Sequence, residues 1–202
     1  MDGNKTAHAA AARERGGSSE NTSLPDLALS VRQPWAWAII HGGKVIENRT
    51  AGAVRTGGMT CRRIAIHAAS AMTRAEYEWG LDRLARHGVS CPRPEALIRR
   101  AIIGAVDVVD IVTESDSPWF GGPCGLVLEN PVACAPVPAT GHLGYFGWQR
   151  SGAVRAPAPW MARFDLTTAD ADAPSLFPDA PAAFAEQRER PSRMRKRPRS
   201  DI

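Results

Sequence analysis

Two neighbouring stretches decide the fold, LSVRQPWA at residues 29–36 and GKVIENR at residues 43–49. Apolar residues alternate over residues 27–31, which is the pattern of a half-buried strand. Pro34 fits the first turn of a helix, because its missing N–H costs nothing there, and Gly42-Gly43 should end that helix. An extended segment follows the two glycines. We therefore predict a strand, a short helix and a second strand.

Three further segments continue the strand pattern. Residues 62–67 and 101–112 are rich in β-branched and other apolar residues, and Gly104 inside the longer segment suggests a bulge. Residues 124–129 form another apolar run, and Asn130-Pro131 should end it because proline cannot donate to a central strand.

One long helix is predicted after the second of these strands. Thr73 and Glu76 have the spacing of a capping box, an apolar stripe follows them, and Gly88 should close the helix. Residues 50–60 are expected to form a loop. Residues 160–166 are a candidate for one more strand.

This order of elements predicts the fold class. The strands are short and outnumber the helices, and most of them are not separated by a crossover helix. A small α+β barrel flanked by two or three helices therefore fits the pattern better than a doubly wound sheet.

Composition divides the chain into one domain and two tails. Residues 1–25 contain almost no large apolar side chains, so we expect them to be disordered. Residues 27–166 form the expected domain. Residues 167–202 are predicted to be a linker, a short helix at 181–190 and a basic disordered end. Residues 187–202 hold seven basic and two acidic residues, so their net charge is +5. The whole chain has a net charge of +4, so the rest of it sums to −1.

Other classes of protein are disfavoured by what the sequence contains. The four cysteines have no CxxC spacing and no histidine at a metal-ligand interval, so we expect free thiols and no bound metal or other cofactor. No apolar stretch is long enough for a membrane span, and no signal sequence is recognisable. Neither a phosphate-binding loop nor a dinucleotide fingerprint occurs. We expect an intracellular protein of the cytoplasm.

The two stretches that open the domain resemble the ASCH family (activating signal cointegrator homology). The family pattern is a strand, a helix that starts at a QPW-type motif, and a G-x-K-x-x-E-x-R run. Further similar segments follow in the family's order: residues 64–68, 103–106, 125–131 and 141–146. The resemblance covers residues 27–150.

Several expectations follow from this resemblance. It implies a β-barrel related to PUA domains, with a ligand cleft floored by the barrel and edged by the QPW helix. Members are thought to bind RNA or DNA as modules. Some small bacterial members are similar to amidohydrolases that deacylate N4-acetylcytidine, and others have ribonuclease activity. This chain is longer than the small hydrolases and has Glu47 where they carry a hydroxyl residue, which leaves that exact reaction in doubt.

The main candidate site residues are Lys44, Glu47 and Arg49. If the protein is an enzyme, Lys44 and Glu47 are the candidate catalytic residues. In a strand, residues 47 and 49 share a face, and Lys44 can swing toward them because it follows Gly43. Two cations around one carboxylate can hold a phosphate or polarise a carbonyl. The structural alternative is a salt-bridge network on an edge strand.

Five other residues complete the expected ligand site. Arg32 ends the first strand on its polar face, and Gln33, Pro34 and Trp35 form the helix start, where free N–H groups attract anions. Trp35 either stacks on a base or fixes the helix to the core. His67 ends a strand and titrates near neutral pH, although a histidine in a strand is more often structural.

The basic C-terminal end predicts an arm that binds nucleic acid without sequence preference. Its expected contact residues are Arg193, Arg195, Lys196, Arg197 and Arg199. A nuclear-import signal and a solubilising tail are the alternatives.

Two classes of function follow. The first is a module that binds RNA or DNA. The second is an enzyme, a hydrolase of a modified nucleoside or a ribonuclease. A protein-binding adaptor is a third, weaker option. The Arg-rich tail and the charges of the expected cleft favour the binding module, with RNA as its expected ligand and the enzyme as the alternative.

Overall fold

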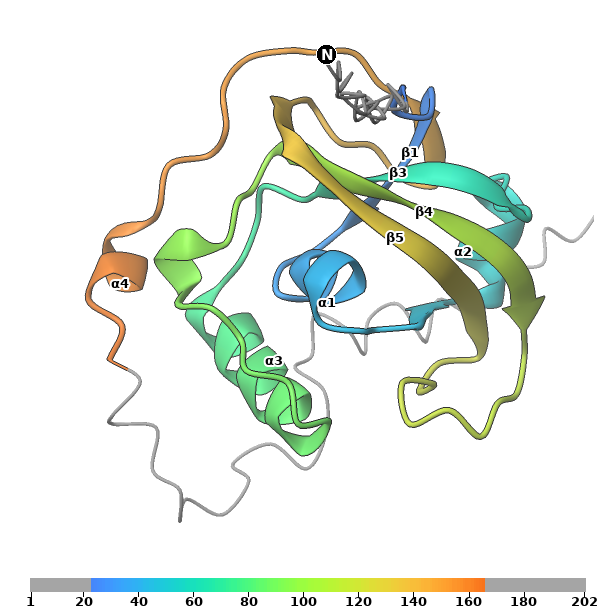
Figure 1. The fold of residues 1–202 in the computed structure, drawn as a ribbon, viewed down its shortest axis with the longest axis horizontal. Coiled ribbons are helices and arrows are strands. Elements are labelled where there is room, and N and C mark those ends of the chain that lie inside the picture. The colour runs from blue at the N-terminus through green and yellow to red at the C-terminus, as the bar shows by residue number, and fades with distance from the viewer. Residues whose placement is uncertain (1–22, 166–202) are drawn as a thin grey trace, which may run out of the picture.

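The fold is a sheet curled into a half-barrel around one short helix (Figure 1). The computed structural model describes residues 23–165, and within them the chain has an α+β fold of six strands and four helices. The strands are β1 (Leu27–Val31), β2 (Ile46–Arg49), β3 (Arg62–Ala68), β4 (Ala101–Val112), β5 (Cys124–Pro138) and β6 (Tyr145–Gly147). The helices are α1 (Trp35–His41), α2 (Ala51–Thr56), α3 (Arg74–Arg86) and α4 (Pro159–Ala162), and a 3-10 turn spans Pro94–Ala96.

The strands follow the order β2-β5-β4-β3-β1-β6. β1 and β3 are parallel, and the other neighbouring pairs are antiparallel. The two long strands β4 and β5 carry the curl, and their pairing shifts register at three places. Such bulges increase the local twist of a sheet, so they bring its far edges toward each other.

Three apolar clusters lie among the described residues, and two of them position the helices. The first fills the concave side of the sheet, where Ile39 and Ile40 of α1 pack among side chains from β1, β3, β4 and β5. The second joins α3 to the C-terminal end of the described chain, where Tyr77 and Leu84 pack with Met161 and Phe164. Figure 1 shows α3 below α1, on the open side of the curl.

Most of the elements predicted from the sequence are confirmed. α1 ends where the two glycines follow it, and Gly43 has a positive φ of 67°. α3 has its capping box, because the Thr73 hydroxyl accepts from the Glu76 N–H and the Glu76 carboxylate accepts from the Thr73 N–H. β4 has the predicted bounds, and its register shifts next to Gly104.

The prediction that Asn130-Pro131 ends a strand is wrong. β5 continues to Pro138, because Asn130 adopts a positive φ of 48° and lets the strand bend. β2 pairs with the beginning of β5 only, so the later half of β5 has a free edge on that side. A proline is tolerated at such an edge because no ladder bond is lost there.

Four further predictions are corrected. Residues 50–60 contain α2 instead of a continuous loop, and Thr50 caps it by accepting from the Ala53 N–H. The candidate strand at 160–166 is instead the short helix α4 with a turn, whose Trp160 and Phe164 pack against Tyr77. Pro34 is the cap residue just before α1 instead of part of its first turn. The helices therefore number four among the described residues, more than the two or three predicted.

Several sequence predictions lie outside the described residues. These are most of the N-terminal tail, the linker, the helix at 181–190 and the basic arm with its residues Arg193, Arg195, Lys196, Arg197 and Arg199.

Candidate functional site

Lys44, Glu47 and Arg49 form one cluster. Lys44 Nζ lies 2.7 Å from Glu47 Oε2 and also donates to the carbonyl of Ile46. Arg49 Nη2 lies 3.1 Å from Glu47 Oε1. Each carboxylate oxygen of Glu47 therefore has its own cation. Lys44, which follows Gly43 after α1, thus turns toward Glu47.

This cluster is not on a solvated edge. Lys44 is 5% exposed and Glu47 is 7% exposed. Burial lowers the pKa of Lys44, and Glu47 offsets this shift only in part. Burial also acts to raise the pKa of Glu47, but Lys44 and Arg49 together outweigh it, so that pKa is lowered. Glu47 is thus held ionised, and Arg49 would still balance its charge if Lys44 released a proton.

Arg49 connects one edge strand of the curled sheet, β2, to β1, which lies next to the other edge strand, β6. It extends from the edge strand β2, and its Nη2 donates to the carbonyl of Ser30 in β1 at 2.9 Å. Its Nε is buried and has no hydrogen-bond partner among the described residues. Burial raises the pKa of Tyr145 to about 12, and the charges of Arg62 and Arg49 oppose that rise. Tyr145 is therefore within electrostatic reach of Arg49. The junction of β2 and β1, which we call the seam of the half-barrel, therefore carries the Arg49 guanidinium, whose Nε–H has no acceptor among the described residues.

The residues of the QPW motif have different roles. The side chain of Gln33 is 2% exposed and braces the chain, since its Nε2 donates to the Ile98 carbonyl at 2.7 Å and its Oε1 accepts from the Trp37 N–H at 2.9 Å. Pro34 packs against Gly80 of α3, where an added Cβ would lie 2.5 Å from Pro34 Cγ. These two residues position α1 and α3, and they are not free to contact a ligand through polar atoms.

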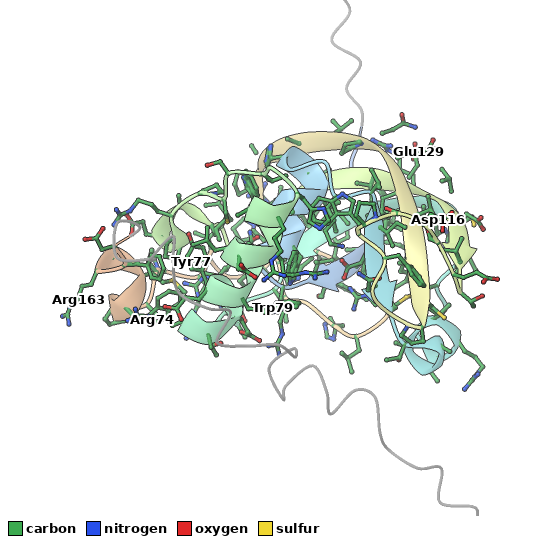
Figure 2. The ribbon with its side chains drawn as sticks, turned by 90° about the horizontal axis from the view of Figure 1, so that it is seen from below. Arg74, Tyr77, Trp79, Asp116, Glu129 and Arg163 are labelled. Carbon is green, nitrogen blue, oxygen red and sulfur yellow. The ribbon has the colours of Figure 1, made fainter. Side chains whose placement is uncertain are left out.

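Arg32 and Trp35 remain partly accessible. Arg32 forms an ion pair with Glu76 of α3, and 45% of its side chain is exposed. Trp35 is half-buried between the two apolar clusters and meets Trp79 edge to face, with 5.2 Å between ring centroids. Figure 2 shows Trp79 on the side of α3 that is nearer the strands, whereas Arg163 lies by α4 at the far end of the molecule.

Both ring nitrogens of His67 have hydrogen-bond partners. Its Nδ1 lies 3.0 Å from the Ser30 hydroxyl, and its Nε2 lies 3.1 Å from the carbonyl oxygen of Ala139. The carbonyl can only accept, so Nε2 carries the proton and Nδ1 accepts from Ser30. Burial lowers the pKa of His67, which favours this neutral form. His67 is linked to Arg49 through Ser30, and its place in the packing fits the structural interpretation.

Sequence reasoning missed an aromatic pair beside the cluster. His87 at the end of α3 stacks on Trp119, with 3.7 Å between centroids and 14° between planes. Burial, the charge of Arg83 and the charge of Lys44 all lower the pKa of His87, so this pair lies within electrostatic reach of Lys44. No local pattern links residues 87 and 119, because only the folded loop brings them together.

Asn48 fixes the loop that carries Trp119. Its Nδ2 donates to the Trp119 carbonyl at 2.8 Å, and its Oδ1 accepts from the Gly121 N–H at 2.9 Å. Asn48 lies between Glu47 and Arg49 in β2 and has the opposite parity in the strand. The same short strand thus supplies the cluster from one face and holds the β4–β5 loop with the other.

The described residues contain no group of three or more His, Cys, Asp or Glu side chains placed to hold a metal ion. No helix among them is long and apolar enough to span a membrane. No family model matches the chain, and no curated protein matches it either.

Proposed function

We propose that this chain is an ASCH-type nucleic-acid-binding domain that holds one nucleotide of an RNA strand at the Lys44–Glu47–Arg49 cluster. The observation that carries the proposal is the buried cluster itself, which has two cations for one carboxylate and a buried Arg49 Nε–H without a partner among the described residues. An unsatisfied buried donor is costly unless a ligand or water completes it. An anionic or carbonyl oxygen would satisfy it.

Charge around the cluster supports an anionic ligand. Arg49 contacts the backbone two residues before Arg32, whose half-exposed guanidinium pairs with Glu76 through Nη1. Arginine suits this role because its planar donors match phosphate oxygens. The resemblance to the ASCH family rests on the same residues and implies the same class of ligand.

Aromatic groups support a base in addition to a phosphate. Trp35, Trp79, His87 and Trp119 are all partly exposed and come from α1, α3 and the β4–β5 loop, the elements next to the cluster. Stacking of one base on an aromatic ring contributes about 1–3 kcal/mol in single-strand binding. A strand with an unpaired base therefore suits this region better than a duplex.

The test is RNA binding by the full chain, measured by fluorescence anisotropy with a labelled single strand of about ten nucleotides. The double variant Lys44→Met/Glu47→Gln removes both charges and retains the side-chain volumes. We expect it to weaken binding about tenfold or more. Arg163→Gln, an exposed arginine at the far end of the molecule, is the control that changes net charge alone. Wild-type affinity in a folded double variant would refute the proposal.

A hydrolase is the second candidate, because Lys44 could stabilise a developing oxyanion while a carboxylate takes a proton from water. In that reaction water attacks the acyl carbon of an N4-acylated cytidine, the C–N bond breaks, and cytidine and the carboxylic acid are released. The lowered pKa of Glu47 makes it a weak base, so binding is the better-supported function. Chromatographic detection of cytidine release that disappears in Glu47→Gln would reverse this ranking.

A further inference from the structure

A cavity of about 700 Å³ lies away from the cluster, on the other side of the start of α3. Its walls are residues 70–73, the pair Arg99 and Arg100, and residues 153–159, which we call the strap. Figure 1 shows the strap as part of the long orange connection between β6 and α4, outside the sheet. A cavity of this size is within the range of small-molecule sites and is much larger than a single inorganic ion needs.

The charge of this cavity is unbalanced. Arg99, Arg100 and Arg155 line it together with the hydroxyl residues Ser70 and Thr73, and no Asp or Glu is among its lining residues. The nearest described carboxylate along the chain is Glu76, which is engaged by the capping box and by Arg32. Among the described residues, Glu76 pairs with Arg32 and Glu95 pairs with Arg93, so the mutual repulsion of the three arginines favours an anion beside them.

Arg99 is the built-in part of the site. It is 4% exposed, and its two Nη atoms donate to the carbonyls of Ser70 at 3.3 Å and Ala156 at 2.6 Å. Its Nε is buried and has no hydrogen-bond partner among the described residues. Burial and the charge of Arg155 lower its pKa, which shows that the two guanidinium groups feel each other. Joining the strap at Ala156 to the segment at Ser70 explains the two carbonyl contacts, but it explains neither the unused Nε–H nor the second cation.

Arg100 provides independent support. It has a positive φ of 59°, a conformation that a non-glycine residue rarely keeps without a reason. Its guanidinium lies beside Gly152, where an added Cβ would be 3.0 Å from Arg100 Nη2. The backbone thus turns a second arginine toward the end of the strap, next to Arg99.

We infer that this cavity binds a phosphate ester, with Arg99, Arg100 and Arg155 holding the phosphate and the apolar part of the strap covering the organic group. Val154, Pro157 and Pro159 supply that apolar wall. The phosphate belongs either to a free mononucleotide or to the backbone of a nucleic-acid strand. The inference does not depend on the proposed function of the Lys44–Glu47–Arg49 cluster.

Isothermal titration calorimetry on the full chain tests this site with adenosine 5′-monophosphate, adenosine and inorganic phosphate as probes. Arg155→Gln is the main variant, because the Arg155 side chain is exposed and its backbone, not its guanidinium, is bonded to Arg99. We expect it to weaken monophosphate binding about tenfold or more. Arg163→Gln should bind like wild type, and adenosine should not bind detectably.

A second variant guards against local unfolding. Ala153→Glu places a carboxylate at an exposed position of the cavity wall and should also abolish monophosphate binding while thermal unfolding stays cooperative. Unchanged affinity in both folded variants would overturn the inference. So would loss of monophosphate binding in Lys44→Met/Glu47→Gln with retention in Arg155→Gln, because the phosphate would then belong to the first site.

An oligonucleotide distinguishes the two sources of phosphate. If a strand of about ten adenylates binds more tightly than the monophosphate and Arg155→Gln removes the difference, the cavity holds the backbone of a strand. If the monophosphate binds equally well or better, the ligand is a free nucleotide. Either result supports the site. The site would be refuted if Arg155→Gln bound the strand as tightly as wild type does and also bound the monophosphate as tightly as wild type does.

Discussion

Glu47 shows how the effect of one residue depends on its neighbours. A single carboxylate balances two cations inside the protein, so removing it leaves two charges without a partner. Removing the Lys44–Glu47 pair leaves only Arg49, which keeps its bond to the Ser30 carbonyl and is partly exposed.

We expect Glu47→Gln to lower the free energy of unfolding by about 3–5 kcal/mol, the usual cost of breaking a buried pair from one side. The double variant Lys44→Met/Glu47→Gln should stay within about 1 kcal/mol of wild type, because no buried ammonium remains. Urea unfolding followed by circular dichroism measures both. Equal losses in the single and double variants would show that the pair is not coupled.

The buried histidine at residue 67 predicts a pH dependence. Its pKa is lowered from the ordinary value of 6.5, so the folded state binds fewer protons than the unfolded state below that value. Its contribution to stability is fully present above pH 6.5 and is lost as the pH falls below it. We expect the free energy of unfolding to decrease between about pH 7.5 and pH 5.5.

His67→Gln should reduce this slope when urea unfolding is repeated across the same pH range. It should not abolish the slope, because burial and nearby cations also lower the pKa of His87. The lowered pKa of Glu47 acts in a separate window below its ordinary value of 4.5. An unchanged slope in His67→Gln would mean that folding does not shift the pKa of His67.

Between elements, the contact of α1 with α3 depends on a missing side chain. Gly80 lies in the middle of α3, where glycine is a poor helix former, yet the ring of Pro34 occupies the space that a Cβ would need. Gly52 of α2 offers a comparison, because the nearest atom to its added Cβ is 3.9 Å away.

We expect Gly80→Ala to destabilise the protein by about 1–3 kcal/mol, since overpacking outweighs the gain in helix propensity. Gly52→Ala should be neutral or stabilising by up to about 1 kcal/mol. Thermal unfolding of the two variants side by side makes the comparison. A stabilised Gly80→Ala variant would show that the helices separate easily.

The element scale also shows where local sequence decides structure. β4 and α3 could be predicted because apolar periodicity and a capping box are local signals. The continuation of β5 beyond Pro131 could not, since it depends on whether a neighbouring strand occupies that edge. The helix α4 was missed for a similar reason, because its Trp160 is placed by the ring of Tyr77 far away in the chain.

For the whole molecule, the same distinction separates the predicted site from the rest. Lys44, Glu47 and Arg49 are close in sequence, so strand parity for residues 47 and 49 and the turn after Gly43 were enough to group them. The stacking of His87 on Trp119 and the meeting of Arg99 with Arg155 need the complete chain path. The cavity under the strap therefore had no signature in the sequence.

Arg49 links the edge strand β2 to β1, and this predicts a pattern of hydrogen exchange. In Arg49→Gln, amides of β2 and α2 should exchange about tenfold faster or more, whereas those in the centre of β3 and β4 should change less. Mass-spectrometric exchange on peptides from each element measures this difference. A uniform increase across the sheet would indicate global destabilisation instead of a loosened seam.

The packing of α4 on α3 has a consequence for the order of events during synthesis. Tyr77 and Leu84 emerge from the ribosome long before Met161 and Phe164, which cover them in the finished domain. Until the last part of the domain is outside the exit tunnel, this apolar helix surface of the nascent chain stays exposed to solvent. Chaperones that recognise such surfaces would have their longest opportunity at this helix.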